Sequence, residues 1–503
     1  MEYKWLVLSN TTIATLMAAL DTNIVLIALP TIGRDLAGTT ATTLLWVLLG
    51  YSLLTAVVVL NFGRLSDIFG RVRLYVLGFA IFTLGSLLCG FSETGVELVG
   101  FRLVQAVGAG FLFSNSAAII TDAFPPNERG RALGINQVSI VVGAVVGLVV
   151  GGILTTAVGW RWIFFVNVPI GAIATVRARL DLREIVRPRT EQPIDWLGNL
   201  VFAAGLALFL VAITFGALGE WSFDQSLVAG VVALGLLVAF LAIERRVPYP
   251  MLDLTLFRSR QFSDTALASF LNALARGAFT FVLVFYLQGP PRYLDPLTAG
   301  LYLVPVSAAL AVAGPVSGWL SDRYGGWPFT VGGLVASLAA FGWLATIGEG
   351  ASFGALLGPF VLLGAGMGLF ASPNRAAMMS AVPPSRRGVA SGVGTTLINT
   401  GSTMALGLTL AIMVTVLPLS SLEAILIGVP GGTPGTLGAD FLRAVHIVFL
   451  VSAGLLLGAL GLVLARNPYR TPNREIAEAE ERSSAGGASP SPGAAPIGAP
   501  KQP

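Results

Sequence analysis

Asp21 is the residue of this sequence best placed to do chemistry, because it lies inside an otherwise uncharged hydrophobic stretch from Trp5 to Leu29. An ionised carboxylate is costly in such surroundings, and it marks a functional site by default. Binding a proton makes the same acid neutral, so Asp21 is able to alternate between two charge states. The alternative is a structural acid that is permanently paired with a buried base.

Three bases occupy comparable positions in other hydrophobic stretches: Arg102, Arg276 and Arg375. Arg102 lies at about the same depth in its stretch as Asp21 does in the first one, so the two charges can influence each other. Burial raises the pKa of such an acid, and a nearby positive charge lowers it. An acid that couples proton binding to a conformational change needs the sum of these two effects to differ between conformations. Arg276 and Arg375 have no evident carboxylate partner in the sequence, and either anion binding or bonding to helix carbonyls would account for them.

A further group of charges follows the second hydrophobic stretch. Asp67 can accept hydrogen bonds from the N-terminus of a neighbouring helix, whose dipole favours an anion. Arg71 presents a planar fork that suits a carboxylate, and Asp122, at the end of the fourth stretch, is its nearest plausible partner. The alternative is that these charges only anchor loops at a membrane surface.

The composition is that of a polytopic membrane protein. Of the 503 residues, 55% are hydrophobic and only 11% are charged, whereas roughly a quarter are charged in soluble domains. Apolar stretches of about 20 residues, the length that an α-helix needs to cross a bilayer, recur along the chain. We expect an all-α fold with fourteen transmembrane helices, at approximately 5–29, 44–63, 74–91, 97–120, 133–157, 162–178, 196–218, 226–244, 263–288, 298–319, 328–347, 353–378, 388–417 and 441–465.

The arginines predict the orientation of these helices. Most of them lie in loops that alternate with loops holding only Arg34, Arg161 and Arg292. By the positive-inside rule, the arginine-rich loops and both termini are cytoplasmic. The excess of positive charge is then expected to contact anionic lipid and not nucleic acid. The N-terminus lacks a cleavable signal pattern, so we expect the first helix to be retained.

An internal repeat divides the chain. The segment 63–70 is echoed by 318–325, and the segment 125–130 by 383–388, at nearly the same offset. Parallel six-helix halves are a known transporter architecture, with the substrate site between the halves. We predict four parts: an N-terminal six-helix half at 1–180, two inserted helices with flanking cytoplasmic loops at 181–260, a C-terminal six-helix half at 261–466, and a largely disordered cytoplasmic tail at 467–503.

Polar residues within the spans are candidates to line a substrate cavity. Each of these side chains is equally able to bond another helix. The candidates are Gln105, Asn115, Asn136, Asn272, Arg276 and Asn399.

Recognisable catalytic and metal-binding patterns are missing from the sequence. It has no phosphate-binding loop and no catalytic-triad spacing. A single cysteine, Cys89, excludes an internal disulfide, and a single histidine, His446, leaves no soft metal cluster. We therefore expect neither a cofactor nor a metal, and no enzymatic activity.

Several of these patterns resemble the major facilitator superfamily, and within it the fourteen-helix drug:proton antiporters. The resemblance covers residues 5–465. It is carried by Gly63-x-Leu65-x-Asp67-x-x-Gly70-Arg71-x-Arg73 in the loop between helices two and three, Leu20-Asp21 with Ala28-Leu29-Pro30 in the first helix, Arg102-x-x-Gln105 in the fourth, and Asn167-x-Pro169-x-Gly171 approaching the sixth.

The resemblance implies a transporter whose two halves rock about a central cavity in a bacterial plasma membrane. It implies that Asp21 and Arg102 couple transport to protons. It also implies that a charge network locks the cytoplasmic side in the outward-facing state, with Asp67 set against the start of the thirteenth helix near Gly388. The residues of this gating network are Gly63, Asp67, Gly70, Arg71, Arg73 and Asp122.

The fifth helix resembles the antiporter motif of the family but departs from it at one position. Its glycines are Gly143, Gly147, Gly151 and Gly152, whereas the usual proline is Leu148. Glycines at this spacing lie on one face and let another helix approach closely. The alternative for each glycine is ordinary helix packing without a role in antiport.

The expected function is proton-driven export of hydrophobic or amphiphilic compounds by a monomeric transport unit. The first alternative is an exporter, symporter or uniporter of a specific metabolite or lipid on the same fold, and a more distant one is a transport-inactive membrane sensor. Asp21 is the one acid deep within a span, against three bases. Because one acid cannot offset the desolvation of two positive charges, we expect dications to be poor substrates.

Overall fold

The computed structural model describes residues 2–125, 128–185, 195–248, 250, 252, 254–289, 292–382, 387–427 and 437–465. Within these ranges the chain is helical apart from its loops and one isolated bridge between Ala37 and Thr94. Fourteen helices of the described chain are long and apolar enough to cross a membrane. The predicted all-α, polytopic fold class is confirmed.

The described residues up to Glu244 form nine helices, most of them longer than a bilayer requires. Among the described residues, the sixth span is broken at Val166 into two helices. The helices are α1 (Tyr3–Asp35), α2 (Ala41–Phe69), α3 (Arg71–Gly90), α4 (Gly95–Ala123), α5 (Arg129–Ala157), α6 (Trp162–Phe165), α7 (Asn167–Asp181), α8 (Trp196–Ala217) and α9 (Phe223–Glu244).

The second part begins with a short 3-10 helix and repeats the pattern of long helices. One short helix, α15, follows Pro418 and was not predicted, because nine residues are too few to give the signal of a membrane span. The elements are η1 (Leu254–Arg258), α10 (Arg260–Gln288), α11 (Pro296–Tyr324), α12 (Gly326–Leu344), α13 (Phe353–Ser380), α14 (Arg387–Val416), α15 (Leu419–Ile427) and α16 (Leu437–Leu464).

Local capping residues set where several helices begin. Thr40 at α2 and Ser222 at α9 each form a capping box with the residue three positions later. Asp295 caps α11 by accepting hydrogen bonds from the hydroxyl and the backbone N–H of Thr298, and these bonds lower the pKa of its carboxyl. Such caps satisfy backbone donors that a helix leaves free at its N-terminus.

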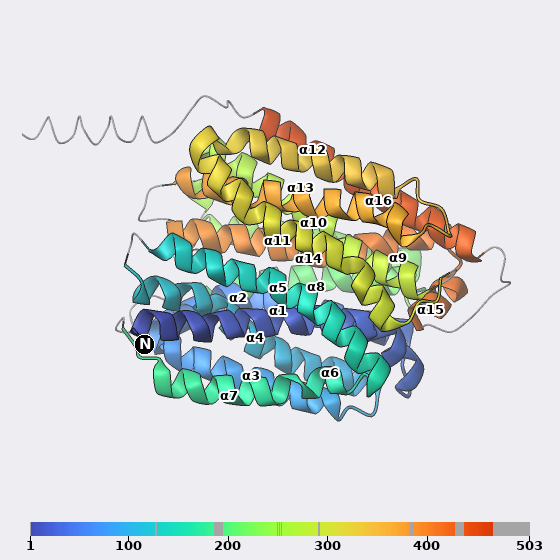
Figure 1. Ribbon diagram of the computed structural model, residues 1–503, viewed down its shortest axis with the longest axis horizontal. Helices are drawn as coiled ribbons and strands as arrows, with labels where there is room; N and C mark the ends of the chain where they lie inside the picture. Colours follow the sequence, from blue (N-terminus) through green and yellow to red (C-terminus); the bar gives the residue numbers. More distant parts are fainter. Residues whose placement is uncertain are drawn as a thin grey trace, which may run out of the picture. The chain divides into compact units, whose positions relative to one another are not determined.

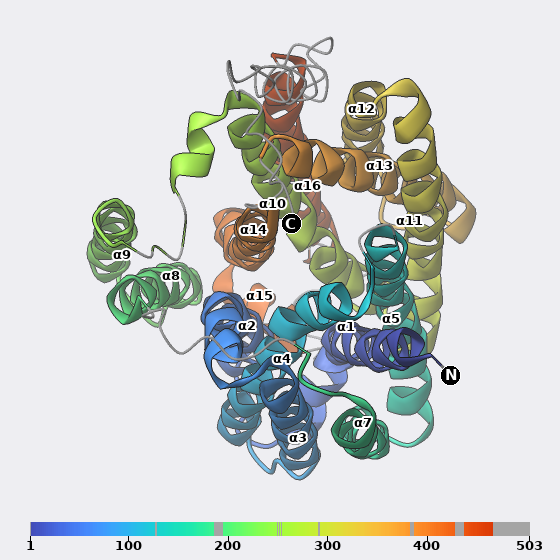
Figure 2. The ribbon, with the colours of Figure 1, turned by 90° about the vertical axis from the view of Figure 1, so that its left-hand side faces the viewer.

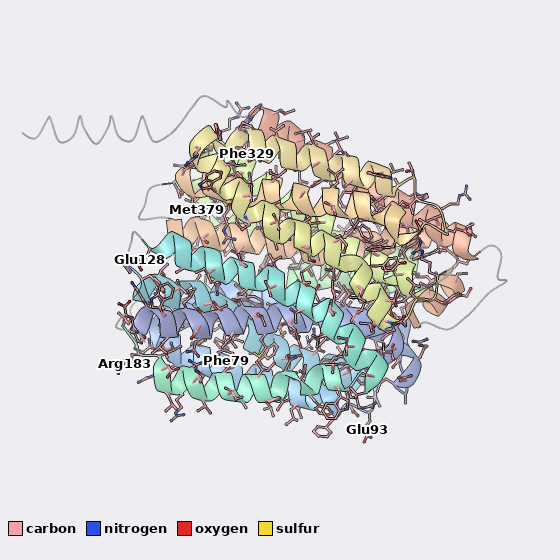
Figure 3. The ribbon with its side chains drawn as sticks, viewed as in Figure 1. Phe79, Glu93, Glu128, Arg183, Phe329 and Met379 are labelled. Atoms are coloured by element: carbon pink, nitrogen blue, oxygen red, sulfur yellow. The ribbon has the colours of Figure 1, made fainter. Side chains whose placement is uncertain are left out.

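The long helices lie side by side (Figure 1). In Figure 3, Glu128 and Arg183 lie at one end of the bundle and Glu93 at the other, whereas Phe79 lies between helices. On α9, Val231 and Leu234 are well exposed. Apolar side chains exposed along a helix whose polar groups are at its ends fit a lipid environment.

Two groups of helices are visible when the bundle is viewed along its helices (Figure 2). Helices α1 to α7 form one group, and α10 to α14 with α16 form the other. The inserted helices α8 and α9 pack against each other, and α8 also contacts α2 and α14. The interpretation of the two groups as moving halves with the predicted boundaries stays a prediction, and the predicted tail at 467–503 lies outside the described residues.

The two groups touch at one end of the bundle. Gln288 of α10 donates a hydrogen bond from Nε2 to the Ile27 carbonyl of α1 over 2.9 Å. At the same end, α5 meets α11, where a Cβ atom at Gly152 would lie 2.7 Å from the Pro296 carbonyl oxygen. Glycine therefore permits a close approach between the groups at this position.

Candidate functional site

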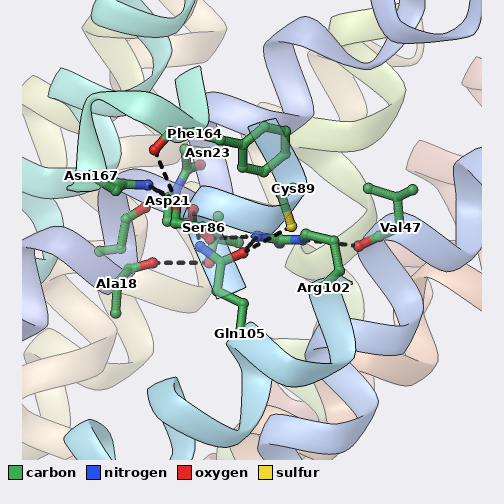
Figure 4. A network of polar contacts seen from close by, with 12 residues as sticks. Ala18, Asp21, Asn23, Val47, Ser86, Cys89, Arg102, Gln105, Phe164 and Asn167 are labelled. Atoms are coloured by element: carbon green, nitrogen blue, oxygen red, sulfur yellow. Dashed lines mark hydrogen bonds and ion pairs between the residues drawn. The ribbon is translucent and has the colours of Figure 1, made fainter. Parts of the chain in front are cut away.

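The Asp21 carboxylate of α1 meets three side chains from α4 and α7 (Figure 4). Arg102 donates from Nη1 to Asp21 Oδ2 over 2.6 Å, and Gln105 donates from Nε2 to Oδ1 over 2.8 Å. Asn167, the first residue of α7, donates from Nδ2 to Oδ1 over 2.9 Å. All four side chains are buried. The sequence-predicted pair Asp21 and Arg102 is therefore brought into direct contact.

Every partner of Asp21 in this network is a hydrogen-bond donor. Gln105 presents its amide N–H to Asp21 because its Oε1 accepts a second bond from Arg102 Nη1, over 2.7 Å. An ionised carboxylate can only accept hydrogen bonds, and these three donors provide for that form. Charge-assisted bonds of this kind offset the cost of burying the two ions, and loss of either ion would leave the other uncompensated.

A further set of bonds connects Asp21 to the break between α6 and α7. Asn167 Nδ2 also lies 3.3 Å from Ser86 Oγ of α3, and Ser86 donates to the Phe164 carbonyl of α6 over 3.0 Å. Phe164, before Val166, and Asn167, after it, thus share one polar cluster with the acid. A movement of the Asp21 side chain would therefore alter the hydrogen bonds at this helix break.

Arg102 is held from several directions. Its Nε donates to the Val47 carbonyl of α2 over 3.3 Å, and its guanidinium carbon lies 4.0 Å from the centroid of the Tyr51 ring. Its Nη2 has no hydrogen-bond partner among the described residues, although it is buried. An aromatic face attracts a desolvated cation, which adds to the ion pair with Asp21.

The antiporter-motif glycines bring α5 against α1 directly behind Asp21. A Cβ atom at Gly147 would lie 2.6 Å from the Leu20 carbonyl oxygen, and one at Gly143 would lie 2.5 Å from that of Leu16. Gly151 faces α1 in the same way, whereas Gly152 faces α11. Three of the four predicted glycines therefore share one helix contact, and the fourth belongs to a different one.

At the end of the bundle where α2 joins α3, Arg71 and Asp122 form the ion pair anticipated from the sequence. Arg71 Nη1 lies 2.8 Å and 2.7 Å from the two carboxylate oxygens of Asp122. Gly70 has a φ of 106°, a conformation that favours glycine. The Arg73 side chain is exposed, and a Cβ atom at Gly63 would meet no neighbour. The side chain of Asp67 lies outside the described residues, so its role and that of the network stay predictions.

Glu184 is a member of this region that the sequence did not suggest. Its Oε1 accepts a hydrogen bond from the backbone N–H of Arg73 over 3.0 Å, in the first turn of α3. A Cβ atom at Gly70 would lie 2.5 Å from the same oxygen. A carboxylate at a helix N-terminus is stabilised by the free N–H groups and the dipole.

Among the predicted cavity residues, several amides bond within the protein. Asn115 donates to the Phe111 carbonyl one turn earlier in α4, over 2.8 Å. Asn136 of α5 donates to Thr15 Oγ1 of α1 over 3.1 Å. Asn399 is partly buried, and Gln105 belongs to the Asp21 network. Their role as cavity lining stays a prediction.

The two other predicted bases lie in the second group of helices. Arg276 donates from Nη1 to Asn272 Oδ1 over 3.2 Å, and Arg375 donates from Nη2 to Ser391 Oγ over 3.3 Å. In the part of the chain that the structure describes, neither arginine has a carboxylate within 4.0 Å. They differ in this respect from Arg102.

Cys89 and His446 make local contacts. Cys89 is buried with its Sγ 3.9 Å from Gln105 Oε1, and His446 Nε2 lies 2.8 Å from the Ile347 carbonyl oxygen. Over the described ranges, no three His, Cys, Asp or Glu side chains gather as a metal site requires.

Comparison with known families decides the class of protein. Residues 11–407 match the sequence pattern of the Major Facilitator Superfamily. The chain belongs to this superfamily. It is therefore a membrane transporter of many spans, and the ion pair of Asp21 and Arg102 lies within the membrane-spanning bundle of such a transporter.

Superfamily members similar to this chain have different named roles. The riboflavin transporter RibZ of Clostridioides difficile is 32% identical over 388 residues, which cover 77% of this chain and 83% of that protein. The multidrug resistance protein Stp of Mycobacterium tuberculosis is 33% identical over 402 residues, covering 79% and 74%. The efflux pump FUS6 of Gibberella fujikuroi is 31% identical over 411 residues, covering 79% and 73%.

Solved structures of transporters share the fold of this superfamily member. An autoinhibited peptide transporter of the POT family has a TM-score of 0.65 at 20% identity, covering 93% of this chain and 98% of that one. An inward-facing bacterial homologue of the human lysosomal transporter Spinster has a TM-score of 0.63 at 17% identity, covering 92% and 96%. At these identities the likeness concerns the fold alone.

Gln105, Asn167 and Ser86 are members of the Asp21 network that the sequence did not assign to it, and Gln105 was predicted only as cavity lining. Asn167 stood out only as part of the motif before the sixth span, and its polarity beside Pro169 was the available signal. Ser86 gave no signal, because a serine in an apolar helix usually bonds its own backbone. Its contact with Asn167 depends on how α3 and α7 face each other.

Proposed function

We propose that this superfamily member exports hydrophobic or amphiphilic compounds in exchange for protons. The observation that carries the proposal is the carboxylate of Asp21, which is fully buried among membrane helices and bonded only to donors. Such an acid is costly to keep and changes its bonding when it binds a proton. Relatives named as multidrug resistance protein and efflux pump support the choice of cargo.

Protonation of Asp21 would force its partners to rearrange. The neutral acid carries an O–H donor, and Arg102 has no acceptor to receive it. The amides of Gln105 and Asn167 would have to turn over before they could accept it, because both present N–H groups to Asp21. These partners belong to α4 and α7, so proton binding would displace those helices relative to α1. In a transporter with two rocking halves, this displacement would favour one of the two states.

The state with the outer side closed fits the proposed orientation. With both termini in the cytoplasm of a bacterial plasma membrane, the end where Gln288 bonds the Ile27 carbonyl faces outwards. Release of that contact, and formation of the predicted Asp67 and Arg71 lock at the opposite end, would open the outer side. Each monomer would carry out this cycle by itself.

A second candidate is transport of one specific metabolite. It is favoured by the similarity to the riboflavin transporter over 388 residues. The two candidates are distinguished by competition. Many unrelated amphiphiles should compete for a broad exporter, whereas only close analogues should compete for a transporter of one compound. Riboflavin that competes strongly while unrelated amphiphilic dyes do not would favour this second candidate.

The experiment uses inverted membrane vesicles, whose outer face is cytoplasmic. Accumulation of the monocationic dye ethidium is measured with and without an acid-inside gradient in wild type and in Asp21→Asn. We expect the gradient-dependent component to disappear in Asp21→Asn, because the amide keeps the volume and cannot titrate. Asp181→Asn, which alters a partly exposed acid paired with Arg177, is the control. Full gradient-driven uptake by Asp21→Asn would contradict the proposal.

A further inference from the structure

Arg276 and Asn272 lie one turn apart on α10 and leave strong hydrogen-bond donors unused. Arg276 Nε and Asn272 Nδ2 are both buried atoms, and neither has a hydrogen-bond partner among the described residues. Asn272 is buried as a whole, whereas Arg276 keeps part of its surface accessible. A buried donor without an acceptor costs free energy, and the cost is larger for a charged group.

The bond between the two residues fixes which edge of the guanidinium is open. Arg276 Nη1 donates to Asn272 Oδ1, so the amide must turn its N–H groups away from the arginine. The edge formed by Nε and Nη2 then remains for a ligand. Two parallel N–H groups on this edge match a carboxylate, sulfonate or phosphate group.

No acid of the described chain neutralises this charge. Arg102 in the first group of helices has Asp21 at 2.6 Å, but no carboxylate lies within 4.0 Å of Arg276 in the described ranges. Helix α10 also contacts α1, so Arg276 lies on a helix that borders the other group. In transporters of this architecture the substrate site lies between the two groups.

We propose that Arg276 and Asn272 form a binding subsite for the single anionic group of an amphiphilic substrate. The proposal rests on the proposed transport of amphiphiles and specifies their charge. The anion would accept hydrogen bonds from Arg276 Nε and Nη2, while Asn272 Oδ1 holds Nη1 and so fixes the orientation of the guanidinium. Bound in this way, the anion would supply the acceptor that Arg276 Nε lacks.

Binding of two matched dyes tests the subsite without a proton gradient. Anilinonaphthalene sulfonate and phenylnaphthylamine share one aromatic scaffold, and only the first carries an anionic group. Equilibrium dialysis measures their binding to the full-length protein in lipid nanodiscs, with empty nanodiscs subtracted. We expect wild type to bind the sulfonate about tenfold more tightly than the neutral amine.

Three variants distinguish loss of the positive charge of Arg276 from a general disturbance of the fold. Arg276→Gln should lose about tenfold in sulfonate affinity and keep its affinity for the amine. Asn272→Asp should lose as much, because it places a carboxylate within bonding distance of Arg276 Nη1 and so neutralises the charge that the anion would otherwise meet. Arg375→Gln, which removes the same group from α13, should leave both affinities within about twofold.

Two results would overturn the subsite. One is equal binding of the two dyes by wild type, or no sulfonate binding above that of empty nanodiscs. The other is an unchanged sulfonate affinity in both Arg276→Gln and Asn272→Asp while binding of the amine shows that they are folded. Either result leaves gradient-driven export of ethidium untouched, so failure of the subsite is distinguishable from failure of the proposed function.

Discussion

Each of the two groups of helices has a charged residue in its first long helix, but the two residues differ in how many hydrogen-bond partners the protein gives them. Asp21 of α1 has a counter-ion at 2.6 Å and two further donors. Arg276 of α10 has one neutral partner and an unused Nε. A fully bonded ion changes its surroundings only when it gains or loses a proton. An ion that lacks partners instead favours a ligand that supplies them.

This difference suggests a division of work within one transporter. The group from α1 to α7 would carry the proton, and the group from α10 to α16 would contact the charged part of the substrate. Each role needs a buried charge, and burying a charge is costly unless something compensates for it. For Asp21 the compensation is built into the protein, and for Arg276 it would arrive with the substrate.

Arg102→Met should have the largest effect on stability, because it removes the counter-ion of the buried Asp21 carboxyl. We expect a loss of about 3–5 kcal/mol in the free energy of unfolding. Adding Asp21→Asn should restore much of it, since the remaining carboxamide carries no charge. Thermal unfolding of the purified variants measures both effects. If the double variant is as unstable as Arg102→Met alone, the buried charge is not the cause.

Gly147→Ala should have the second largest effect on stability, because its Cβ atom would lie 2.6 Å from the Leu20 carbonyl oxygen next to Asp21. Separating α5 from α1 there should cost about 1–3 kcal/mol, as overpacking generally does. Gly134→Ala in the same helix is the matched control, since its Cβ atom would meet nothing within 4 Å. Similar unfolding temperatures for the two variants would show that the close approach at Gly147 is unimportant.

The charge inventory predicts a smaller difference between substrates. One acid deep in the bundle cannot compensate two positive charges, so a dicationic dye should be transported several-fold less well than a monocationic dye of similar size. Competition between the two in inverted vesicles measures the ratio. Robust transport of the dication would mean that another acid reaches the substrate.

Asp67→Asn should have the smallest effect on binding. The residue belongs to the predicted gate near the end of α2, so substrate affinity should stay within a few-fold while turnover slows. Accessibility labelling of single cysteines would report the ratio of the two states. An unchanged ratio together with normal turnover would leave anchoring of a loop as its only role.

The sequence predicted the features that depend on composition and depth. Fourteen spans follow from apolar length, and the meeting of Asp21 with Arg102 follows from their similar depth in two spans. The partners Asn167 and Ser86 could not be predicted, because their contact depends on how α3 and α7 are rotated about their axes. The break at Val166 does have a signal in the sequence, because Pro169 lacks the N–H that would bond the Phe165 carbonyl four residues earlier. Apolar length alone does not reveal it.

Polar residues within spans were the least predictable class. Asn136 was expected in a cavity, but its amide bonds Thr15 between α5 and α1. An amide in an apolar helix satisfies itself either at a neighbouring helix or at a ligand, and a single sequence does not distinguish the two. Asn272 differs because its Nδ2 remains without a partner among the described residues.

Release of protons on substrate binding tests the role of Asp21 most directly. Purified protein in weakly buffered detergent solution, at a pH where transport is active, is mixed with ethidium while a pH-sensitive dye follows the proton concentration. If Asp21 exchanges a proton for substrate, wild type should release protons and Asp21→Asn should release none, although it still binds ethidium. Equal proton release by the two proteins would contradict the assignment of the transported proton to Asp21.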